Sequence, residues 1–205
     1  MHGAIMRRPP TPIAGVAYGT DKPMKSLIAL LLCAVAAPAT IAQDAAPAAP
    51  LRKPDVRYQP SPQKKVRAML DLAGVKPGDV VYDLGSGDGR IPIAAAKDYG
   101  ARGVGIDIDP ERIAEAKANA SAAGVAGRVD FRLQDLFAAD FSDATVATLF
   151  LWPDINRKLR PKLMALKPGT RIVSYWHDMG DWKPDRTIRG GLLGGDIHLW
   201  TVPER

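Results

Sequence analysis

The chain is poor in the residues that build metal and redox centres. Its 205 residues include one cysteine, Cys33, and three histidines, His2, His177 and His198. Beyond Cys33 there is no thiol for a disulfide, a zinc–cysteine site, an iron–sulfur cluster or a cysteine nucleophile. The three histidines are far apart in sequence and lack the spacing of metal ligands. We therefore expect no metal site.

The chain also lacks a long basic run. It carries 28 Lys and Arg against 22 Asp and Glu, a net charge of +6. Residues 1–42 hold four of the basic side chains and one of the acidic ones, so about half of the excess belongs to this leader. The mild excess that remains in residues 43–205 is weak support for a nucleic-acid partner, and none is expected.

The leader has the layout of a secretory signal. In residues 24–42, Lys25 supplies a positive head, residues 27–37 form an apolar run, and small residues follow. Cleavage after Ala39 or Ala42 fits this pattern. The pattern predicts export or membrane anchoring, at the periplasm or inner membrane, since an uncleaved segment of this kind can serve as an anchor.

Three parts of the chain follow from this pattern. Residues 1–42 are the leader, in which Met24 is a candidate for the true start of translation. Residues 43–54 are rich in Ala and Pro and predict a flexible linker. Residues 55–205 are expected to form one folded domain.

Within the domain, strand patterns alternate with helix patterns. The first helix is expected over residues 61–74, with Ser61 as its N-cap, Pro62 just inside it and Gly74 as its end. Asp109 is the expected cap of a later helix. Strands are predicted at residues 79–84, 103–107, 129–133, 145–152, 171–175, 187–189 and 197–202, and further helices at 90–99, 110–123 and 155–166. This alternation predicts an α/β, doubly wound, mostly parallel sheet, and the last two strands read as an antiparallel hairpin.

A glycine loop follows the first strand. Residues 80–90 read VVYDLGSGDGR, with Asp83 at the strand end and glycines at positions 85, 87 and 89. Glycines let the backbone turn sharply and approach a ligand without a Cβ clash, and the next helix offers free N–H groups to a carboxylate. The carboxylate of Asp83 suits a cationic amine. The methionine end of S-adenosyl-L-methionine (SAM) carries both groups, so the loop predicts a SAM site.

The rival interpretation is a dinucleotide fold. Its fingerprint, G-x-G-x-x-G, needs a third glycine for helix packing. Arg90 occupies that position and Gly89 comes one residue early. The acid at position 83 would also lie poorly beside a pyrophosphate. The fingerprint therefore favours SAM over NAD.

Two further aspartates follow the next two strands. Asp107, with Ile108 beside it, ends the second strand, where a carboxylate can accept hydrogen bonds from ribose hydroxyls. Asp135 follows the third strand and can accept from the adenine amino group; the alternative for Asp135 is an ordinary solvated loop acid. Because ligands of such sheets bind at the carboxyl ends of the strands, all three acids are expected around one site.

With these residues in hand, the chain resembles the lysine methyltransferase family that includes the enzymes acting on the ATP synthase c-subunit and the adenine nucleotide translocase. The resemblance runs from about residue 58 to residue 202. It is carried by residues 58–62 (YQPSP), 80–91, 151–156 (LWPDIN), 160–163 (RPKL), 167–174 (KPGTRIVS) and 179–182 (MGDW).

The resemblance implies a Rossmann-like sheet of seven strands, SAM as cofactor and a protein lysine as methyl acceptor. Five cofactor residues carry over by position from the family, namely Asp83, Gly85, Gly87, Asp107 and Asp135. We expect Tyr58, Ser86 and Ile108 to bind the cofactor as well. Tyr58 is the candidate to close over the methionine end. Known eukaryotic members have a hydrophobic N-terminal segment and act on membrane proteins, which agrees with membrane association through the leader.

The acceptor side is expected at Trp152, Pro153 and Asp154, directly after the fourth strand. Asp154 can orient an amine, or it can be the N-cap of the helix expected from Ile155. Trp152 can wall the acceptor channel or pack in the core. His177 follows an apolar strand and sits next to Asp178, but without a serine or cysteine partner a polar loop pair is the preferred interpretation. Trp176, directly before it, is expected to be a packing residue.

Three functions remain open from the sequence. The first is a protein-lysine methyltransferase and the second a small-molecule methyltransferase. The third is a SAM fold without catalysis, serving at the envelope. The intact glycine loop opposes the third, whereas the signal-like leader favours it because SAM is made in the cytoplasm.

Overall fold

The computed structural model describes residues 53–55, 57–191 and 194–204. The leader and nearly all of the expected linker lie outside these residues. Residues 47–205 form one compact unit, to which everything described here belongs. In the described part of the chain, no helix is both long and apolar enough to cross a membrane.

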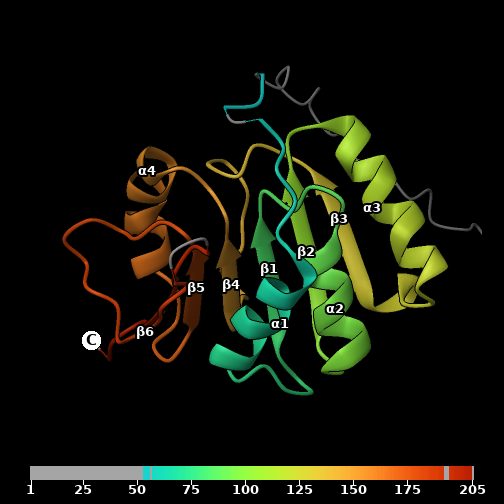
Figure 1. Cartoon of the computed structure of the whole chain (residues 1–205). Coiled ribbons are helices and arrows are strands. Elements are labelled where there is room, and N and C mark those ends of the chain that lie inside the picture. The colour runs from blue at the N-terminus through green and yellow to red at the C-terminus, as the bar shows by residue number, and fades with distance from the viewer. Residues whose placement is uncertain (1–52, 56, 192–193, 205) are drawn as a thin grey trace, which may run out of the picture. The chain divides into compact units, whose positions relative to one another are not determined.

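The described chain forms a seven-stranded sheet covered by helices (Figure 1). Its strand order is β3-β2-β1-β4-β5-β7-β6. The bounds are α1 Gln63–Leu72, β1 Val80–Leu84, α2 Arg90–Asp98, β2 Arg102–Asp107, α3 Pro110–Ala122, η1 Ala126–Arg128, β3 Val129–Leu133, β4 Val146–Leu149, α4 Pro153–Met164, β5 Arg171–Tyr175, β6 Arg186–Ile188 and β7 Ile197–Thr201.

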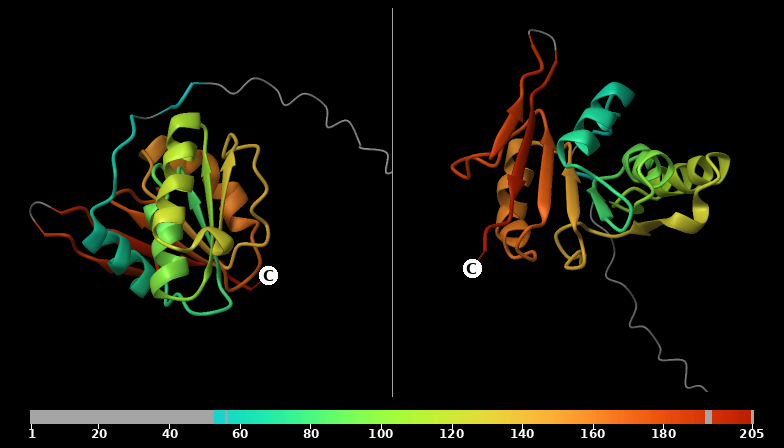
Figure 2. Two further views of the ribbon diagram at one scale, coloured as in Figure 1. Left: turned by 90° about the vertical axis from the view of Figure 1, so that its right-hand side faces the viewer. Right: turned by 90° about the horizontal axis from the view of Figure 1, so that it is seen from below.

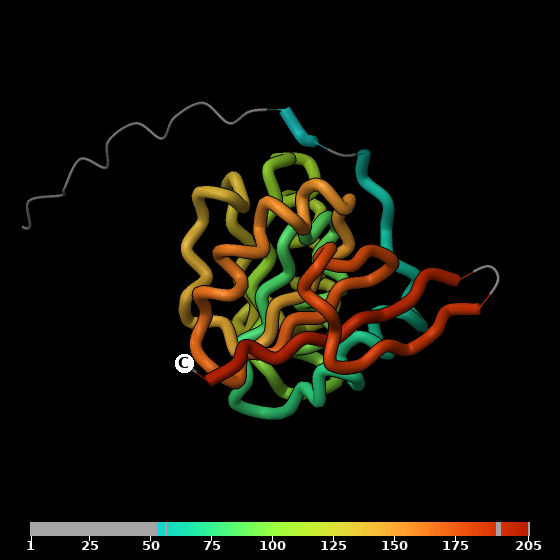
Figure 3. Tube along the Cα trace, turned by 90° about the vertical axis from the view of Figure 1, so that its left-hand side faces the viewer, coloured from blue at the N-terminus to red at the C-terminus, as the bar shows by residue number. Residues whose placement is uncertain are grey.

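Strands β1 to β5 are parallel, and β7 is antiparallel to both β5 and β6. The sheet therefore ends in the hairpin expected from the sequence, which forms its outer edge beyond β5 (Figure 3). The strand order reverses between β1 and β4, and this is the point at which an open α/β sheet leaves a crevice for a ligand. The predicted fold is confirmed.

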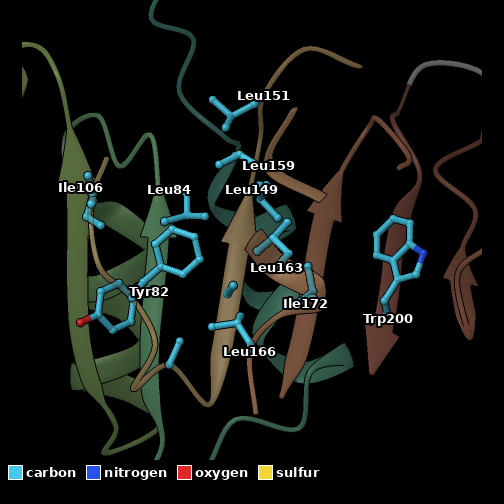
Figure 4. Packing of buried hydrophobic residues seen from close by; sticks show 14 of the residues in the cluster. Tyr82, Leu84, Ile106, Leu149, Leu151, Leu159, Leu163, Leu166, Ile172 and Trp200 are labelled. Atoms are coloured by element: carbon cyan, nitrogen blue, oxygen red, sulfur yellow. The ribbon is translucent and has the colours of Figure 1, made fainter. Parts of the chain in front are cut away.

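The two faces of the sheet are covered by different helices, because side chains alternate along each strand. Helices α1 and α2 pack together, as do α2 and α3, and they cover one face. Helix α4 covers the other face with Leu159 and Leu163 (Figures 2 and 4). There it meets Tyr82 and Leu84 of β1, while their neighbour Val81 belongs to the opposite core. Burial of this kind stabilises a fold by roughly 1.5–3 kcal/mol per large apolar side chain.

Helix boundaries differ from expectation at two prolines. Helix α1 takes Pro62 rather than Ser61 as its N-cap residue, and Ser61 is buried with its carbonyl accepting a hydrogen bond from Arg90 Nη1 at 2.6 Å. Helix α4 begins at Pro153, so Trp152 is the N-cap residue and Asp154 lies inside the first turn. Pro153 is well suited to this first helical position because proline has no N–H to satisfy, whereas Pro62 lies one position before its helix. The N-cap interpretations of Ser61 and Asp154 were therefore wrong, whereas Asp109 does cap α3 by accepting from the Glu111 N–H at 2.8 Å.

The fourth strand is shorter than predicted. The apolar run over residues 145–152 suggested one long strand, but β4 pairs only from Val146 to Leu149. The next three residues leave the sheet and turn toward α4. This early departure places Phe150, Leu151 and Trp152 at the carboxyl edge of the sheet.

Candidate active site

A cavity of about 610 Å³ opens at the carboxyl ends of β1, β2 and β4. Its volume lies in the range of small-molecule and cofactor sites. It is lined by Pro54, Asp55, Arg57, Tyr58, Gln59, Pro60, Ser61, Asp83, Gly85, Ser86, Gly87, Asp88, Arg90, Ile91, Asp107, Ile108, Asp109, Arg112, Asp135, Leu136, Phe150, Leu151, Trp152, Ile155, Trp176 and His177. Every residue predicted for the cofactor is among them.

The glycine loop has the backbone that its sequence requires. Gly85 and Gly87 have φ angles of +88° and +50°, which L side chains rarely adopt. A Cβ on Gly87 would overlap the ring of Tyr58, and one on Gly85 would lie 2.9 Å from the side chain of Leu151. Glycine is needed at both positions for conformation and for space.

Asp107 holds this loop from the neighbouring strand. Its Oδ2 accepts a hydrogen bond from the Gly87 N–H at 2.7 Å, and its Oδ1 accepts one from the Asp109 N–H at 3.0 Å. Each oxygen keeps a second acceptor site, since a carboxylate offers about four in all. Asp107 therefore joins the ends of β1 and β2 and still has capacity for a ligand hydroxyl.

Asp83 is the most unusual ionisable group of the cavity. It is 3% exposed and accepts one hydrogen bond in the described structure, from Thr148 Oγ1 at 2.8 Å. Burial raises the pKa of Asp83 to about 8, against the Thr148 hydrogen bond, and the nearby charges of Asp107 and Asp88 add to the rise. A buried carboxylate of this kind is costly when ionised unless a cation joins it. It thus provides a strong site for a cationic group.

A segment N-terminal to α1 closes over the loop. The Tyr58 ring lies against Gly87 and under the guanidinium of Arg112, which is 4.9 Å from the ring centroid. Arg90 joins Asp88 by an ion pair at 2.5 Å and donates to the Ser61 carbonyl, so it ties this segment to the start of α2. Tyr58 keeps 38% of its surface exposed and lines the cavity.

The remaining predicted acid, Asp135, and the predicted serine, Ser86, both line the cavity. Asp135 lines the cavity and accepts a hydrogen bond from the Phe137 N–H at 2.9 Å. The buried Ser86 hydroxyl has no hydrogen-bond partner among the described residues. A buried polar atom without a partner is rare in folded proteins and fits a site that a ligand completes. The individual contacts of Ser86, Ile108 and Asp135 with a cofactor stay predictions.

The acceptor-side prediction is only partly matched by position. Trp152 lines the cavity with 62% of its surface exposed, so it is not a core residue. Pro153 and Asp154 are not among the lining residues. Asp154 is exposed and forms an ion pair with Arg157 one turn along α4.

Comparisons with known proteins place this architecture in a family. The model of the ANTKMT methyltransferase domain matches residues 83–186. A protein-lysine N-methyltransferase of Saccharolobus islandicus is 45% identical over 155 residues, which are 74% of this chain and 96% of that protein. The chain belongs to this methyltransferase family.

Two further relatives are also methyltransferases. The mouse lysine N-methyltransferase of the ATP synthase c-subunit is 33% identical over 143 residues, which are 69% of this chain and 57% of that enzyme. The chain thus spans little more than half of that longer relative. A crystal structure of an RNA methyltransferase from Salinibacter ruber, in complex with S-adenosyl-L-homocysteine, is 55% identical with a TM-score of 0.69, covering 72% of this chain and 95% of that one.

The cavity of the methyltransferase fits SAM. The partly satisfied carboxylate of Asp83 matches the cofactor's ammonium, and the free acceptor sites of Asp107 match the ribose hydroxyls. The glycine loop leads directly into α2, whose N-terminus favours a carboxylate. S-adenosyl-L-homocysteine, found in the Salinibacter structure, is what SAM becomes when its methyl group leaves.

The cavity residues of the methyltransferase that were not predicted include Trp176 and His177. Trp176 was expected to pack and His177 to be a polar loop residue, but both line the cavity, and Trp176 is 48% exposed. Both follow β5, which lies beside β4 in the sheet. The carboxyl ends of parallel neighbours meet at one edge, so the position after β5 was the available signal.

Proposed function

We propose that this chain is a SAM-dependent protein-lysine N-methyltransferase. The observation that carries the proposal is its 45% identity to a protein-lysine N-methyltransferase that it covers almost end to end. The activities of the longer mammalian relatives, which act on the ATP synthase c-subunit or the adenine nucleotide translocase, support the same class of acceptor.

The residues divide into a cofactor half and an acceptor half. SAM supplies a methyl group on a positively charged sulfur, which makes that methyl open to attack by a neutral amine. We assign Asp83 to the ammonium, the N–H groups after the glycine loop to the carboxylate, and Asp107 to the ribose. Asp135 is assigned to the adenine amino group. Holding the reacting atoms about 3 Å apart and in line accounts for much of the rate in such a transfer.

The acceptor amine would enter beside Trp152. A lysine is protonated in water, with a pKa of about 10.4, and it must lose that proton before it can attack. The aromatic side of the cavity, formed by Phe150, Trp152 and Trp176, disfavours a charged amine by desolvation. This lowers the pKa of an entering amine and favours the reactive form.

Other acceptors are the competing hypotheses. The Salinibacter relative is named an RNA methyltransferase, so RNA is one alternative acceptor. A small molecule is another, and a fold that binds SAM without transferring its methyl group is the third. The four hypotheses differ in where the methyl group is found after the reaction: on protein lysine, on RNA, on a small molecule, or still on SAM.

Incubating the full-length protein and tritiated SAM with a cell lysate tests this proposal. We expect tritium in material that is sensitive to protease and resistant to ribonuclease, with methylated lysine released on hydrolysis. Label removed by ribonuclease, label confined to small molecules, or no transfer at all would each contradict the proposal. Asp83→Asn should give no signal, whereas Asp79→Asn, outside the cavity, should retain it.

We further propose that residues 24–42 hold the enzyme at the membrane with its catalytic domain on the cytoplasmic side. The uncharged stretch 26–42 supports a membrane anchor, and the need for SAM made in the cytoplasm supports the cytoplasmic side for the domain. Fractionation with a reporter fused after residue 205 should place the protein in the membrane fraction, with the reporter inaccessible from outside. A processed protein found only in the periplasm would contradict this.

A further inference from the structure

The loop after β5 brings a histidine into the acceptor half of the cavity. The carbonyl oxygen of His177 accepts hydrogen bonds from Ser174 Oγ at 2.6 Å and from Asn156 Nδ2 at 3.3 Å. The Asn156 amide also reaches the carbonyl of Asp178 at 3.3 Å. Asn156 and Ser174 are both fully buried. The main chain at His177 is therefore held by the core of the domain rather than left to the surface.

The imidazole itself is oriented but not engaged. Its ring stacks on Trp152, with centroids 5.9 Å apart and planes 18° from parallel. Neither ring nitrogen has a hydrogen-bond partner within the described residues. By contrast, five aspartates of the cavity already accept hydrogen bonds from the chain, namely Asp83, Asp88, Asp107, Asp109 and Asp135.

Backbone strain lies next to this histidine. Trp176 is the non-glycine residue with a positive φ, 73°, in the described part of the chain. Its N–H donates to the Asp196 carbonyl at 2.7 Å, and its ring packs so closely on Gly195 that a Cβ there would overlap it. A strained conformation costs about 1–3 kcal/mol and persists where the surrounding structure enforces it, often at functional sites. Here it turns Trp176 and His177 toward the same cavity.

We propose that His177 accepts the proton of the acceptor amine, which enters between Trp152 and Trp176. The inference rests on the amine acceptor proposed above. A ring nitrogen of His177 takes a proton from the alkylammonium, leaving a neutral amine. The amine lone pair then forms the nitrogen–carbon bond as the methyl–sulfur bond breaks, and that electron pair stays on the sulfur. The imidazolium afterwards releases its proton to solvent.

The charge environment favours the accepting form. Burial lowers the pKa of His177 below its ordinary 6.5; the nearby Asp178 opposes this and His198, on β7, adds to it. The side chain is then neutral at pH 7, as a proton acceptor must be. Asn156 and Ser174 are positioning residues here, because they act on His177 and not on the substrate.

Three histidine variants test the inference. His177→Phe keeps a ring for stacking on Trp152 but has no proton-accepting nitrogen. His177→Gln has a matched control in His198→Gln, since His198 lies outside the cavity beside Thr187, 3.0 Å from its hydroxyl. The acceptor is the protein fraction of a ribonuclease-treated lysate, and tritium transfer is measured at several concentrations of that fraction, with SAM affinity measured by calorimetry.

We expect both His177 variants to lose about 100-fold in the maximal rate at pH 7, the range for removing a general base. SAM affinity should stay within twofold. His198→Gln should keep the wild-type maximal rate at pH 7 and shift only the acidic limb, because His198 contributes to the lowered pKa of His177. The wild-type rate should also show an inflection as the pH drops through the His177 pKa, below 6.5. This inflection should be absent in His177→Phe, whose rate should follow only the protonation of the amine.

Two results would overturn the inference. One is a His177→Phe maximal rate within threefold of the wild type. The other is a His177 variant with a raised acceptor KM and an unchanged maximal rate. That result would make His177 part of the cavity wall without a role in proton transfer. In either case a wild type that methylates lysine leaves the proposed function standing. A wild type that methylates no lysine refutes the proposed function and this inference together.

Discussion

Replacing Asp83 by Asn is expected to weaken SAM binding by at least about 100-fold. The variant keeps the shape of the side chain and can still bond to Thr148, but it cannot become the anion that a buried ammonium requires. An uncompensated charge in a buried site costs several kcal/mol, and each 1.4 kcal/mol is a factor of ten in affinity. Calorimetric titration of the full-length protein with SAM measures this.

A second ligand separates the two halves of the cofactor. Methylthioadenosine has the ribose and adenine of SAM but lacks its ammonium and carboxylate. We expect Asp83→Asn to bind methylthioadenosine as the wild type does. Equal losses for SAM and methylthioadenosine would contradict the assignment of Asp83 to the ammonium.

The same substitution should stabilise the empty protein. The pKa of Asp83 rises from 3.8 in the unfolded chain to about 8 in the fold, so the folded state binds more protons between these values. Stability therefore falls as pH rises from about 4 to 8. Removing the carboxyl group should raise the free energy of unfolding at pH 8 by on the order of 5 kcal/mol, which denaturant unfolding at pH 4 and pH 8 would detect. A variant less stable than the wild type at pH 8 would contradict the raised pKa.

Asp79 is the matched control, four residues earlier in the sequence and also buried. Burial alone would raise its pKa, but hydrogen bonds from Thr145, the Lys76 N–H and Arg171 outweigh this and hold the pKa below 3.8. The ionised carboxylate of Asp79 thus stabilises the fold above pH 3.8, and this stabilisation is lost as the pH falls through the lower pKa of the folded state. Asp79→Asn should destabilise the protein at neutral pH and leave SAM affinity unchanged.

Replacing Asp107 by Asn should weaken SAM and methylthioadenosine by the same factor, about 100-fold. Both oxygens of Asp107 accept main-chain hydrogen bonds, from Gly87 at 2.7 Å and from Asp109 at 3.0 Å. An amide has one acceptor and one donor group, so its NH₂ would face an N–H. The glycine loop would lose an anchor and the ribose an acceptor, at about 1–3 kcal/mol for each unsatisfied group. Calorimetry with the two ligands measures the ratio.

The control for this variant is Asp140→Asn. Asp140 accepts a main-chain hydrogen bond from Ser142 at 2.9 Å in the same local manner, but it is exposed and outside the cavity. The Asp140→Asn variant should bind SAM and methylthioadenosine as the wild type does. If Asp107→Asn loses SAM but retains methylthioadenosine, Asp107 acts at the methionine end rather than at the ribose.

Local patterns in the sequence determined most of the fold. The alternation of apolar strands with amphipathic helices, punctuated by glycine and proline, predicted the parallel sheet and the hairpin made by β6 and β7. The glycine loop and Asp83 predicted the cofactor, because backbone freedom and one carboxylate at a strand end are properties of neighbouring residues. Where two local rules competed, at Pro153, the proline rather than the capping side chain set the helix start, whereas α1 begins one residue later than the Ser61–Pro62 pattern predicted.

Only the tertiary structure decided how distant residues share one cavity. Trp176 and His177 read as packing and loop residues because nothing near them in sequence marks a site. They lie in the same cavity as Trp152 because β5 pairs with β4. Asn156, 21 residues before His177 and part of α4, holds the loop by a hydrogen bond to the His177 carbonyl. The protonation of Asp83 is likewise invisible in sequence, since it depends on complete burial against Thr148 of the next strand. The sequence alone thus determined the cofactor loop, whereas the acceptor wall and the charge of the site are properties of the packed sheet.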